Sequence, residues 1–154
     1  MSDQGKKFPL IPPEIEPTAK IVIDAAYRVH TELGAGLLES VYETCLVHEL
    51  GKAGVVVETQ VALPVVYDNL RLDGGYRLDM LVNKHLIVEI KAVDILTDVH
   101  RAQLLTYLKL TKLRLGLLIN FNVAHLKNGI RRVANLNFKT SFVSLASFVV
   151  DFFG

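Results

Sequence analysis

The sequence predicts an α/β fold in which a mixed central sheet is flanked by helices. Apolar residues recur at helical spacing between about residues 18 and 53, and β-branched residues dominate residues 55–93. A further helical segment then leads to the apolar run LRLGLLINF, which is typical of a strand buried on both faces. With 154 residues, of which 51% are hydrophobic and 21% charged, the chain has the composition of one globular domain.

Two amphipathic helices are expected first. The first should run from Thr18 to about Leu33, with Thr18 after Pro17 as a candidate N-cap and with Ile21, Ala25, Val29 and Leu33 recurring every four residues. The second should run from about Leu37 to Ala53, with an apolar face made of Leu38, Val41, Tyr42, Cys45 and Leu46.

Three strands should follow. VVVETQVALPVVYD and YRLDMLV are expected to form two strands joined by the turn residues DNLRLDGG, and LIVEIKAV adds a third to give an antiparallel meander. A helix from about Thr97 to Thr111, begun by the capping pattern ThrAspValHis, then leads to LRLGLLINF. Because a helical crossover precedes this last strand, it should pair in parallel with an earlier one. A short strand is expected near Ile130.

We divide the chain into a flexible leader (1–16), a domain (17–137) and an apolar tail (138–154). The tail would pack on the domain or on a partner, and that partner would be a second copy of the chain if the protein forms a homodimer. The tail region is too short for a membrane span and is interrupted by Asp151. A single cysteine and the lack of an export signal predict a cytoplasmic protein without disulfides or a structural zinc site. A net charge of +1 excludes binding to nucleic acid through bulk charge, so any such affinity must come from local placement.

Charged residues on the second and third expected strands form the candidate site. Residues two apart on a strand share a face, so Glu89 and Lys91 of LIVEIKAV lie side by side. Asp79 of YRLDMLV joins them if the connecting loop has three residues, 83–85, whereas a two-residue loop would put Asp79 and Glu89 on opposite faces. We therefore predict the three-residue loop, or a bulge of equal effect.

These residue types suit the hydrolysis of phosphodiester bonds. Mg²⁺ or Mn²⁺ prefers oxygen ligands, which Asp79, Glu89 and the backbone carbonyl of Ile90 can supply. Lys91 would stabilise charge on the phosphoryl oxygens, or orient and help to deprotonate the attacking water. Glu39 lies at the margin of the apolar face of the second helix and should point toward the same edge of the sheet.

Polar residues of the third helix should line the same cleft. Gln103 and Tyr107 are spaced i, i+4 and share one stripe, with His100 nearby. An ExK triplet alone is usually a surface ion pair, so the interpretation depends on the several polar residues together. For Tyr42, packing with a locally satisfied hydroxyl is the more common role of a tyrosine on an apolar helix face, and we treat it as support for Glu39.

GLLESVY at 36–42 contains Gly36, Glu39 and Tyr42 in the GxxExxY spacing that names a family of small bacterial proteins. The resemblance continues through RLDMLV, IVEIKAV, HRAQLLTYLK and LGLLINF, over roughly residues 18–134. This family is assigned to the PD-(D/E)xK nuclease superfamily, so the resemblance implies a restriction-endonuclease-like αβββαβ core. It also implies metal-binding and catalytic roles for Asp79, Glu89, Lys91 and Glu39, and a QxxxY pair in Gln103 and Tyr107. Leu78 stands where the superfamily's name has proline.

The resulting hypothesis is a metal-dependent nuclease, using Mg²⁺ or Mn²⁺, that hydrolyses phosphodiester bonds of nucleic acid, with DNA as the expected substrate. The alternative is a non-catalytic module that binds nucleic acid or takes part in assembly and keeps the nuclease fold; the near-neutral charge favours it. A small-molecule enzyme on the same scaffold would instead need a closed pocket rather than an open groove.

Overall fold

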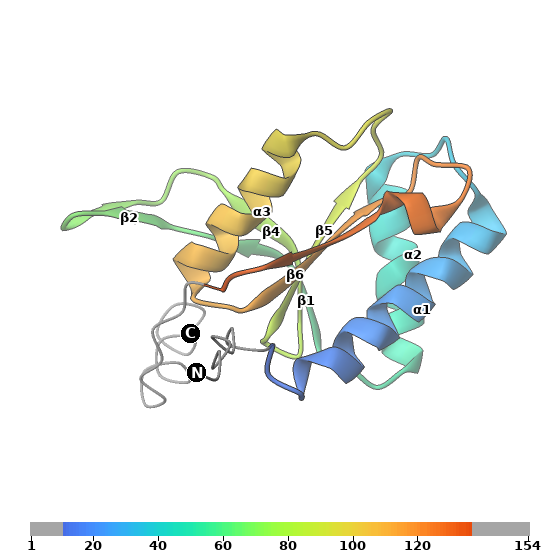
Figure 1. Cartoon of the computed structure of the whole chain (residues 1–154), viewed down its shortest axis with the longest axis horizontal. Coiled ribbons are helices and arrows are strands. Elements are labelled where there is room, and N and C mark those ends of the chain that lie inside the picture. Colours follow the sequence, from blue (N-terminus) through green and yellow to red (C-terminus); the bar gives the residue numbers. More distant parts are fainter. Residues whose placement is uncertain (1–10, 137–154) are drawn as a thin grey trace, which may run out of the picture.

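A five-stranded sheet lies at the centre of the protein, with helices on both of its faces (Figure 1). The computed structural model describes residues 11–136. Its elements, in chain order, are α1 (Ile15–Leu33), α2 (Glu39–Lys52), β1 (Val57–Ala62), β2 (Val65–Tyr67), β3 (Leu70–Leu72), β4 (Arg77–Val82), β5 (Leu86–Lys91), α3 (Asp98–Thr111), β6 (Leu115–Asn120), a 3₁₀ turn η1 (Leu126–Gly129) and β7 (Ile130–Ala134).

The strand order in the sheet is β1-β4-β5-β6-β7. β1, β4 and β5 are antiparallel neighbours, β5 and β6 run parallel, and β6 and β7 are antiparallel. The predicted mixed sheet, the meander, the parallel crossover through α3 and the strand near Ile130 are therefore confirmed. The order of elements agrees with the predicted restriction-endonuclease-like α/β fold.

Two hydrophobic cores cover the two faces of the sheet. Leu86, Val88 and Ile90 of β5 face the core formed with α1 and α2, whereas Ile87 faces the core formed with α3. Because both faces are covered, every residue of β5 except Lys91 is buried. The face that carries Glu89 is therefore not open to water.

Gly116 of β6 allows α3 to pack closely on the sheet. A Cβ atom at this position would lie 2.7 Å from Cδ1 of Leu104. Any side chain here would push α3 away from the strand, which explains a glycine inside a continuous apolar run.

The start of α1 differs from the prediction. The helix begins at Ile15, so Ile15 and Glu16 of the predicted leader belong to it. Thr18 is a buried residue within the helix, and the prediction that it acts as the N-cap is wrong. Its hydroxyl instead contacts Nε2 of His85 at 2.8 Å and accepts a hydrogen bond from Asn83 Nδ2 at 3.3 Å.

The apolar face of α2 is partly as predicted. Tyr42 and Leu46 are fully buried, and Cys45 packs at the edge of the core. Leu38 and Val41, however, are 74% and 38% exposed. Leu38 is the N-cap, with extended backbone geometry, so helical spacing does not place its side chain.

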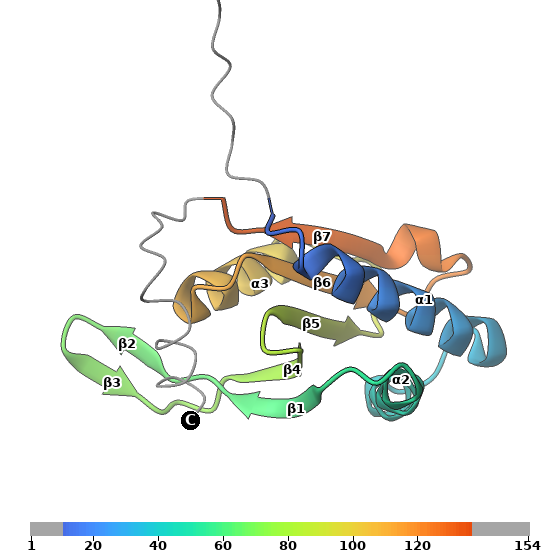
Figure 2. The ribbon, with the colours of Figure 1, turned by 90° about the horizontal axis from the view of Figure 1, so that it is seen from below.

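A hairpin of β2 and β3 interrupts the predicted meander and projects from the body of the protein (Figures 1 and 2). VVVETQVALPVVYD was predicted as one strand, but β1 ends at Ala62 and a separate strand begins at Val65. Pro64 lies between them, and proline has no N–H with which to continue the sheet. Among residues 11–136, β2 pairs with β3 alone, through a turn that contains Asp68 at φ 55°.

Residues 1–10 and 137–154 lie outside the described part of the chain, and so do most of the predicted leader and the whole tail. Among residues 11–136, no helix combines the length and the apolar character that crossing a bilayer requires.

Candidate active site

The loop between β4 and β5 has the three residues that the site requires. Val82 pairs with Leu86 and Met80 with Val88, so residues 83–85 form the turn, as predicted. Asn83 and Lys84 both have positive φ, and the Asn83 side-chain oxygen and backbone N–H are hydrogen bonded to Val56 at 2.9 and 2.8 Å. Asparagine tolerates this left-handed geometry well, and its bonds to the β1 edge fix the turn.

Past the Met80–Val88 pair, on the side away from the turn, side-chain carboxyls of β4 and β5 accept hydrogen bonds from backbone N–H groups of the opposite strand. The backbone N–H of Asp79 donates to Glu89 Oε1 at 3.1 Å, and the N–H of Ile90 donates to Asp79 Oδ2 at 2.8 Å. Each carboxyl thus satisfies an amide of the opposite strand. The three-residue loop and this exchange bring Asp79 and Glu89 together between the two strands.

Glu89 is held in an environment that disfavours its charge. It is 4% exposed. Burial raises its pKa to about 9, and the neighbouring Asp79 carboxylate adds to the rise, while Lys91 acts in the opposite direction. The Asp79 and Glu89 carboxyls also lie within hydrogen-bonding reach of each other. Such a bond requires a proton, which Glu89 keeps because of its raised pKa.

Glu39 and Lys91 lie close to this pair. Burial raises the pKa of Glu39, Lys91 opposes the rise, and Asp79 and Glu43 add to it. Glu39 is the first residue of α2 and also receives a hydrogen bond from the backbone of Ala92. Lys91 is the last residue of β5, and its ammonium acts on both Glu39 and Glu89.

α3 contributes the predicted pair Gln103 and Tyr107. Tyr107 is 6% exposed, and its pKa is raised by burial and then by Glu89, Tyr76 and Asp79. Gln103 forms a hydrogen bond with the Tyr107 hydroxyl, which lowers that pKa in part. Both side chains therefore belong to the surroundings of the carboxyl pair.

His100, on the same helix, has a structural role. Its Nδ1 accepts a hydrogen bond from the backbone N–H of Thr97 at 3.1 Å, and the Thr97 hydroxyl accepts one from the backbone N–H of His100 at 3.4 Å. This reciprocal capping box begins α3 and confirms the predicted capping pattern.

Tyr42 anchors the segment that leads into Glu39. Its hydroxyl donates to the carbonyl of Gly34 at 2.6 Å and accepts from the N–H of Leu37 at 3.2 Å. Its ring stacks on Phe121 with centroids 4.5 Å apart and planes 8° apart. Tyr42, one helical turn after Glu39, therefore packs with its hydroxyl hydrogen bonded locally, which is the more common role expected for it.

Two asparagines that the sequence analysis did not single out hold the loops around the site. Asn120, 1% exposed, accepts from the N–H of Val93 at 3.1 Å and donates to its carbonyl at 2.9 Å, which fixes the chain just after Lys91. Asn122 accepts a hydrogen bond from the N–H of Gly36 at 3.1 Å, in the segment that precedes Glu39. The only signal in the sequence is a pair of asparagines, N-F-N, directly after a buried strand.

The donors suit a hard divalent cation in part. Asp79 and Glu89 are adjacent oxygen donors, and burial beside Asp79 disfavours the ionised form of Glu89, so a bound cation would offset the cost of that charge. Glu39, however, is not grouped with them: within residues 11–136 no three Asp, Glu, His or Cys side chains are arranged as metal ligands. The ligand roles of Glu39 and of the Ile90 carbonyl stay predictions.

Comparison with known families agrees with the fold. A family model described as the PD-(D/E)XK nuclease superfamily matches residues 16–133, a span that contains all the residues discussed above. No curated protein and no solved structure matches the chain. Because the family model covers most of the sequence, the chain belongs to the PD-(D/E)XK nuclease superfamily.

Proposed function

We propose that the protein is a nuclease that hydrolyses phosphodiester bonds of DNA with the help of Mg²⁺ or Mn²⁺. The observation that carries the proposal is the exchange of hydrogen bonds between Asp79 and Glu89, which holds two carboxyls together beside Lys91 at the end of β5. Superfamily membership supports the same conclusion. The finer resemblance to the GxxExxY proteins of bacteria supports the role of Glu39.

Each residue has a separate task in this proposal. Asp79, Glu89 and Glu39, with the Ile90 carbonyl, would hold the cation, which when bound neutralises charge on the phosphate and lowers the pKa of a bound water. Lys91 stabilises the charge that develops on the phosphoryl oxygens or orients the attacking water. Gln103 and Tyr107 shape the cleft on the α3 side, and Tyr42 positions the start of α2.

The direct test is incubation of labelled single- and double-stranded DNA and RNA with the protein in Mg²⁺, Mn²⁺ or chelator. Cleavage should require the cation and should fall at least about 100-fold in Lys91→Ala, because a group that stabilises transition-state charge is removed. Lys84→Ala is a matched control, since Lys84 pairs with Glu58 at the far end of the β4–β5 hairpin. Equal cleavage by wild type and Lys91→Ala would contradict the proposal.

The alternative is a module that binds nucleic acid, or takes part in assembly, without cleaving it. The lack of a three-ligand group among residues 11–136 and the net charge of +1 favour it. Calorimetry separates the two functions: a nuclease should bind Mg²⁺ or Mn²⁺ in a manner that Asp79→Ala abolishes, whereas the alternative predicts no such binding. A cytoplasmic location and a homodimer formed through the tail stay predictions from the sequence.

A further inference from the structure

Tyr76 is an exposed aromatic residue on a fixed support. It lies just before β4, at the base of the β2–β3 hairpin, and 51% of its surface is exposed. Its ring meets the ring of Tyr107 edge to face, with centroids 6.4 Å apart and planes at 65°. Its carbonyl accepts a hydrogen bond from Leu63 N–H at 2.8 Å. Both the ring and the backbone are therefore held in place, although half of the side chain remains open to solvent.

This ring borders the carboxyl pair. Tyr107 is influenced electrostatically by Tyr76 as well as by Glu89 and Asp79, so it lies among all three. Along the chain, Tyr76 precedes Asp79 by three residues, a distance of about 10 Å in an extended strand. Through Tyr107, the exposed ring and the carboxyl pair are close enough for one nucleic-acid strand to contact both.

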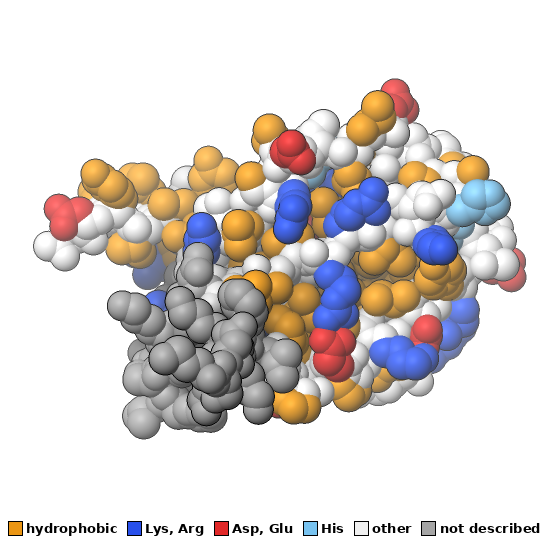
Figure 3. Space-filling model, in the orientation of Figure 1, with side chains coloured by type: hydrophobic (Ala, Val, Ile, Leu, Met, Phe, Trp, Pro, Cys, Tyr) orange, Lys and Arg blue, Asp and Glu red, His pale blue; other side chains and the backbone are white. Residues whose placement is uncertain are grey.

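The charge distribution favours a contact that does not depend on net charge. The net charge is +1, and Figure 3 shows Lys and Arg side chains scattered among hydrophobic and acidic ones on the face in view. Few phosphate contacts would give only weak binding. Stacking of a base on an aromatic ring adds affinity that does not depend on net charge.

Arg77, the next residue in the chain, is the first residue of β4. Its side chain is exposed, and its Nη1 donates to the carbonyl of Gln60 at 3.3 Å, which holds the guanidinium at the surface. Because successive strand residues point to opposite faces, this cation is not placed beside the Tyr76 ring, and base stacking rather than a phosphate contact carries the inference.

We propose that Tyr76 stacks on a base next to the cleaved phosphate and thereby makes the protein select single-stranded nucleic acid. The inference rests on the proposed nuclease function and names its substrate class. In a single strand a base can stack on the ring directly, whereas in a duplex it must first leave its own stack and base pair. Tyr107 supports the ring from the protein side and is too deeply buried to take a base itself.

The first test compares binding of a fluorescent single-stranded DNA with binding of the matching duplex, in chelator to prevent cleavage. Tyr76→Ala should weaken single-strand binding about 5- to 150-fold, the range measured for loss of one stacked base, and should change duplex binding much less. Tyr76→Trp should retain binding because the ring, not the hydroxyl, makes the contact. Tyr67→Ala is the matched control: Tyr67 is 75% exposed, in β2 of the projecting hairpin.

The second test uses only the wild-type protein and keeps the inference falsifiable if Tyr76→Ala does not fold. A single abasic site is moved along the DNA strand, and one position should weaken binding about 5- to 150-fold, the loss expected for one stacked base. In folded Tyr76→Ala, the abasic site at that position should cause no further loss.

Each outcome decides a separate question. A flat abasic scan together with normal metal-dependent cleavage would overturn the stacking inference and leave the nuclease function intact. Equal losses in Tyr76→Ala and Tyr67→Ala, or equal losses for single strand and duplex, would also overturn it. A wild-type protein that neither binds nor cleaves any nucleic acid would overturn both proposals.

Discussion

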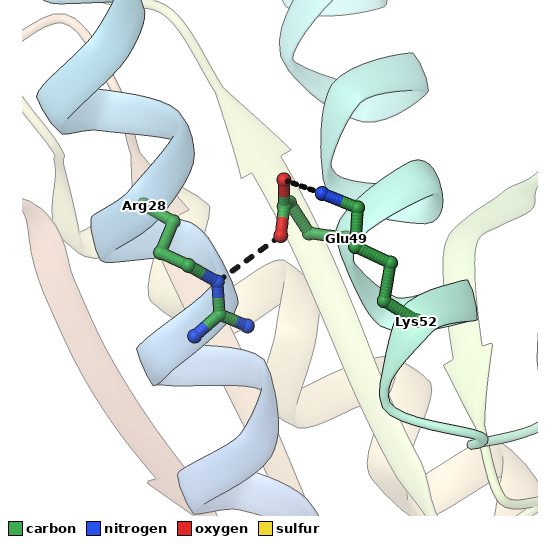
Figure 4. Close-up of polar contacts among 3 residues, drawn as sticks. All are labelled: Arg28, Glu49 and Lys52. Atoms are coloured by element: carbon green, nitrogen blue, oxygen red, sulfur yellow. Dashed lines mark hydrogen bonds and ion pairs between the residues drawn. The ribbon is translucent and has the colours of Figure 1, made fainter.

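Two glutamates, Glu49 on α2 and Glu89 on β5, have pKa values shifted in opposite directions. Glu49 lies between two cations: Lys52 Nζ is 3.0 Å from its Oε1 and Arg28 Nε is 3.1 Å from its Oε2 (Figure 4). Its hydrogen bonds to Lys52 and then to Arg28 lower its pKa. Burial and the Asp79 carboxylate instead raise the pKa of Glu89 to about 9.

The difference shows how a structural carboxylate differs from a candidate functional one. The charge of Glu49 is balanced by Arg28 and Lys52, and its ion pair with Arg28 links α1 to α2 at the surface. Glu89 lies beside another carboxyl. The backbone N–H of Asp79 and the Lys91 ammonium favour its ionised form but do not offset its burial, so that form would gain from positive charge supplied from outside. The predictions below test this contrast, beginning with the largest effect.

Glu89→Gln should have opposite effects on stability and on activity. The amide resembles the protonated carboxyl, so in chelator at pH 7 the variant should gain on the order of 3 kcal/mol in unfolding free energy. Metal-dependent cleavage should be lost because a charged ligand is removed. Urea denaturation and the cleavage assay measure the two effects. If Glu89→Gln were less stable than wild type in chelator, the charge-disfavouring environment assigned to Glu89 would be wrong. The control, Glu49→Gln, should keep cleavage.

Asn120→Ala should destabilise the site end of the sheet. It removes the side chain that bonds to the N–H and C=O of Val93 and to the N–H of Asn122, so partly buried backbone groups lose their partners at a cost of about 2 kcal/mol. Thermal denaturation measures this loss, and cleavage should fall because the chain after Lys91 is no longer fixed. Asn128→Ala, an exposed asparagine in η1, is the control. No change in either assay would exclude a positioning role for Asn120.

The metal-free wild type should become less stable as pH rises. The folded state keeps a proton on Glu89 up to a pKa of about 9, whereas the unfolded chain releases it near the ordinary value of 4.5. Between these values the folded state binds more protons, so unfolding free energy should fall by up to about 1.4 kcal/mol per pH unit. Urea titrations from pH 5 to 8 in chelator test this, and Glu89→Gln should flatten the slope. A wild-type slope of the opposite sign would contradict it.

Features of the site that depend on residues close together in the sequence could be predicted, whereas features that depend on distant segments could not. The juxtaposition of Asp79 and Glu89 depends on strand alternation and loop length, and both are local in the chain. The roles of Asn120 and Thr18 depend on which distant backbone lies beside them once the sheet and α1 have packed. Nothing near these residues in the sequence reports that packing. The β2–β3 hairpin has a local signal, Pro64, which ends β1, but the apolar residues around it read as one strand.

Tyr42→Phe isolates one contact of the anchor before Glu39. It keeps the ring on Phe121 and removes the hydroxyl that bonds to Gly34 and Leu37, so the unfolding free energy should fall by about 1 kcal/mol. Chemical denaturation measures this change. Cleavage should decrease modestly with its pH profile unchanged, since no titrating group of the site is altered. A changed pH profile would indicate that the phenol takes part in the chemistry.

Glu49→Gln should have the smallest effect. Surface ion pairs contribute little and are screened by salt, so its loss of stability should be smaller than that of Tyr42→Phe and should vanish at 1 M NaCl. Because the folded state lowers the pKa of Glu49, its contribution is present above pH 4.5 and is lost as pH falls through the folded-state value. Thermal denaturation at low and high salt measures it. A loss that persists at high salt would show that Glu49 is not simply a surface pair.

The reciprocal hydrogen bonds between side-chain carboxyls and backbone amides of β4 and β5 also provide two amides whose hydrogen exchange depends on the state of the site. The N–H groups of Asp79 and Ile90 are bonded to side chains that can ionise or turn toward a ligand, whereas their neighbours along the same strands are bonded to backbone. Whatever draws the two carboxyls away frees these two amides and leaves the rest of the sheet closed. Hydrogen–deuterium exchange at just these positions would then follow occupancy of the site, with no substrate turned over.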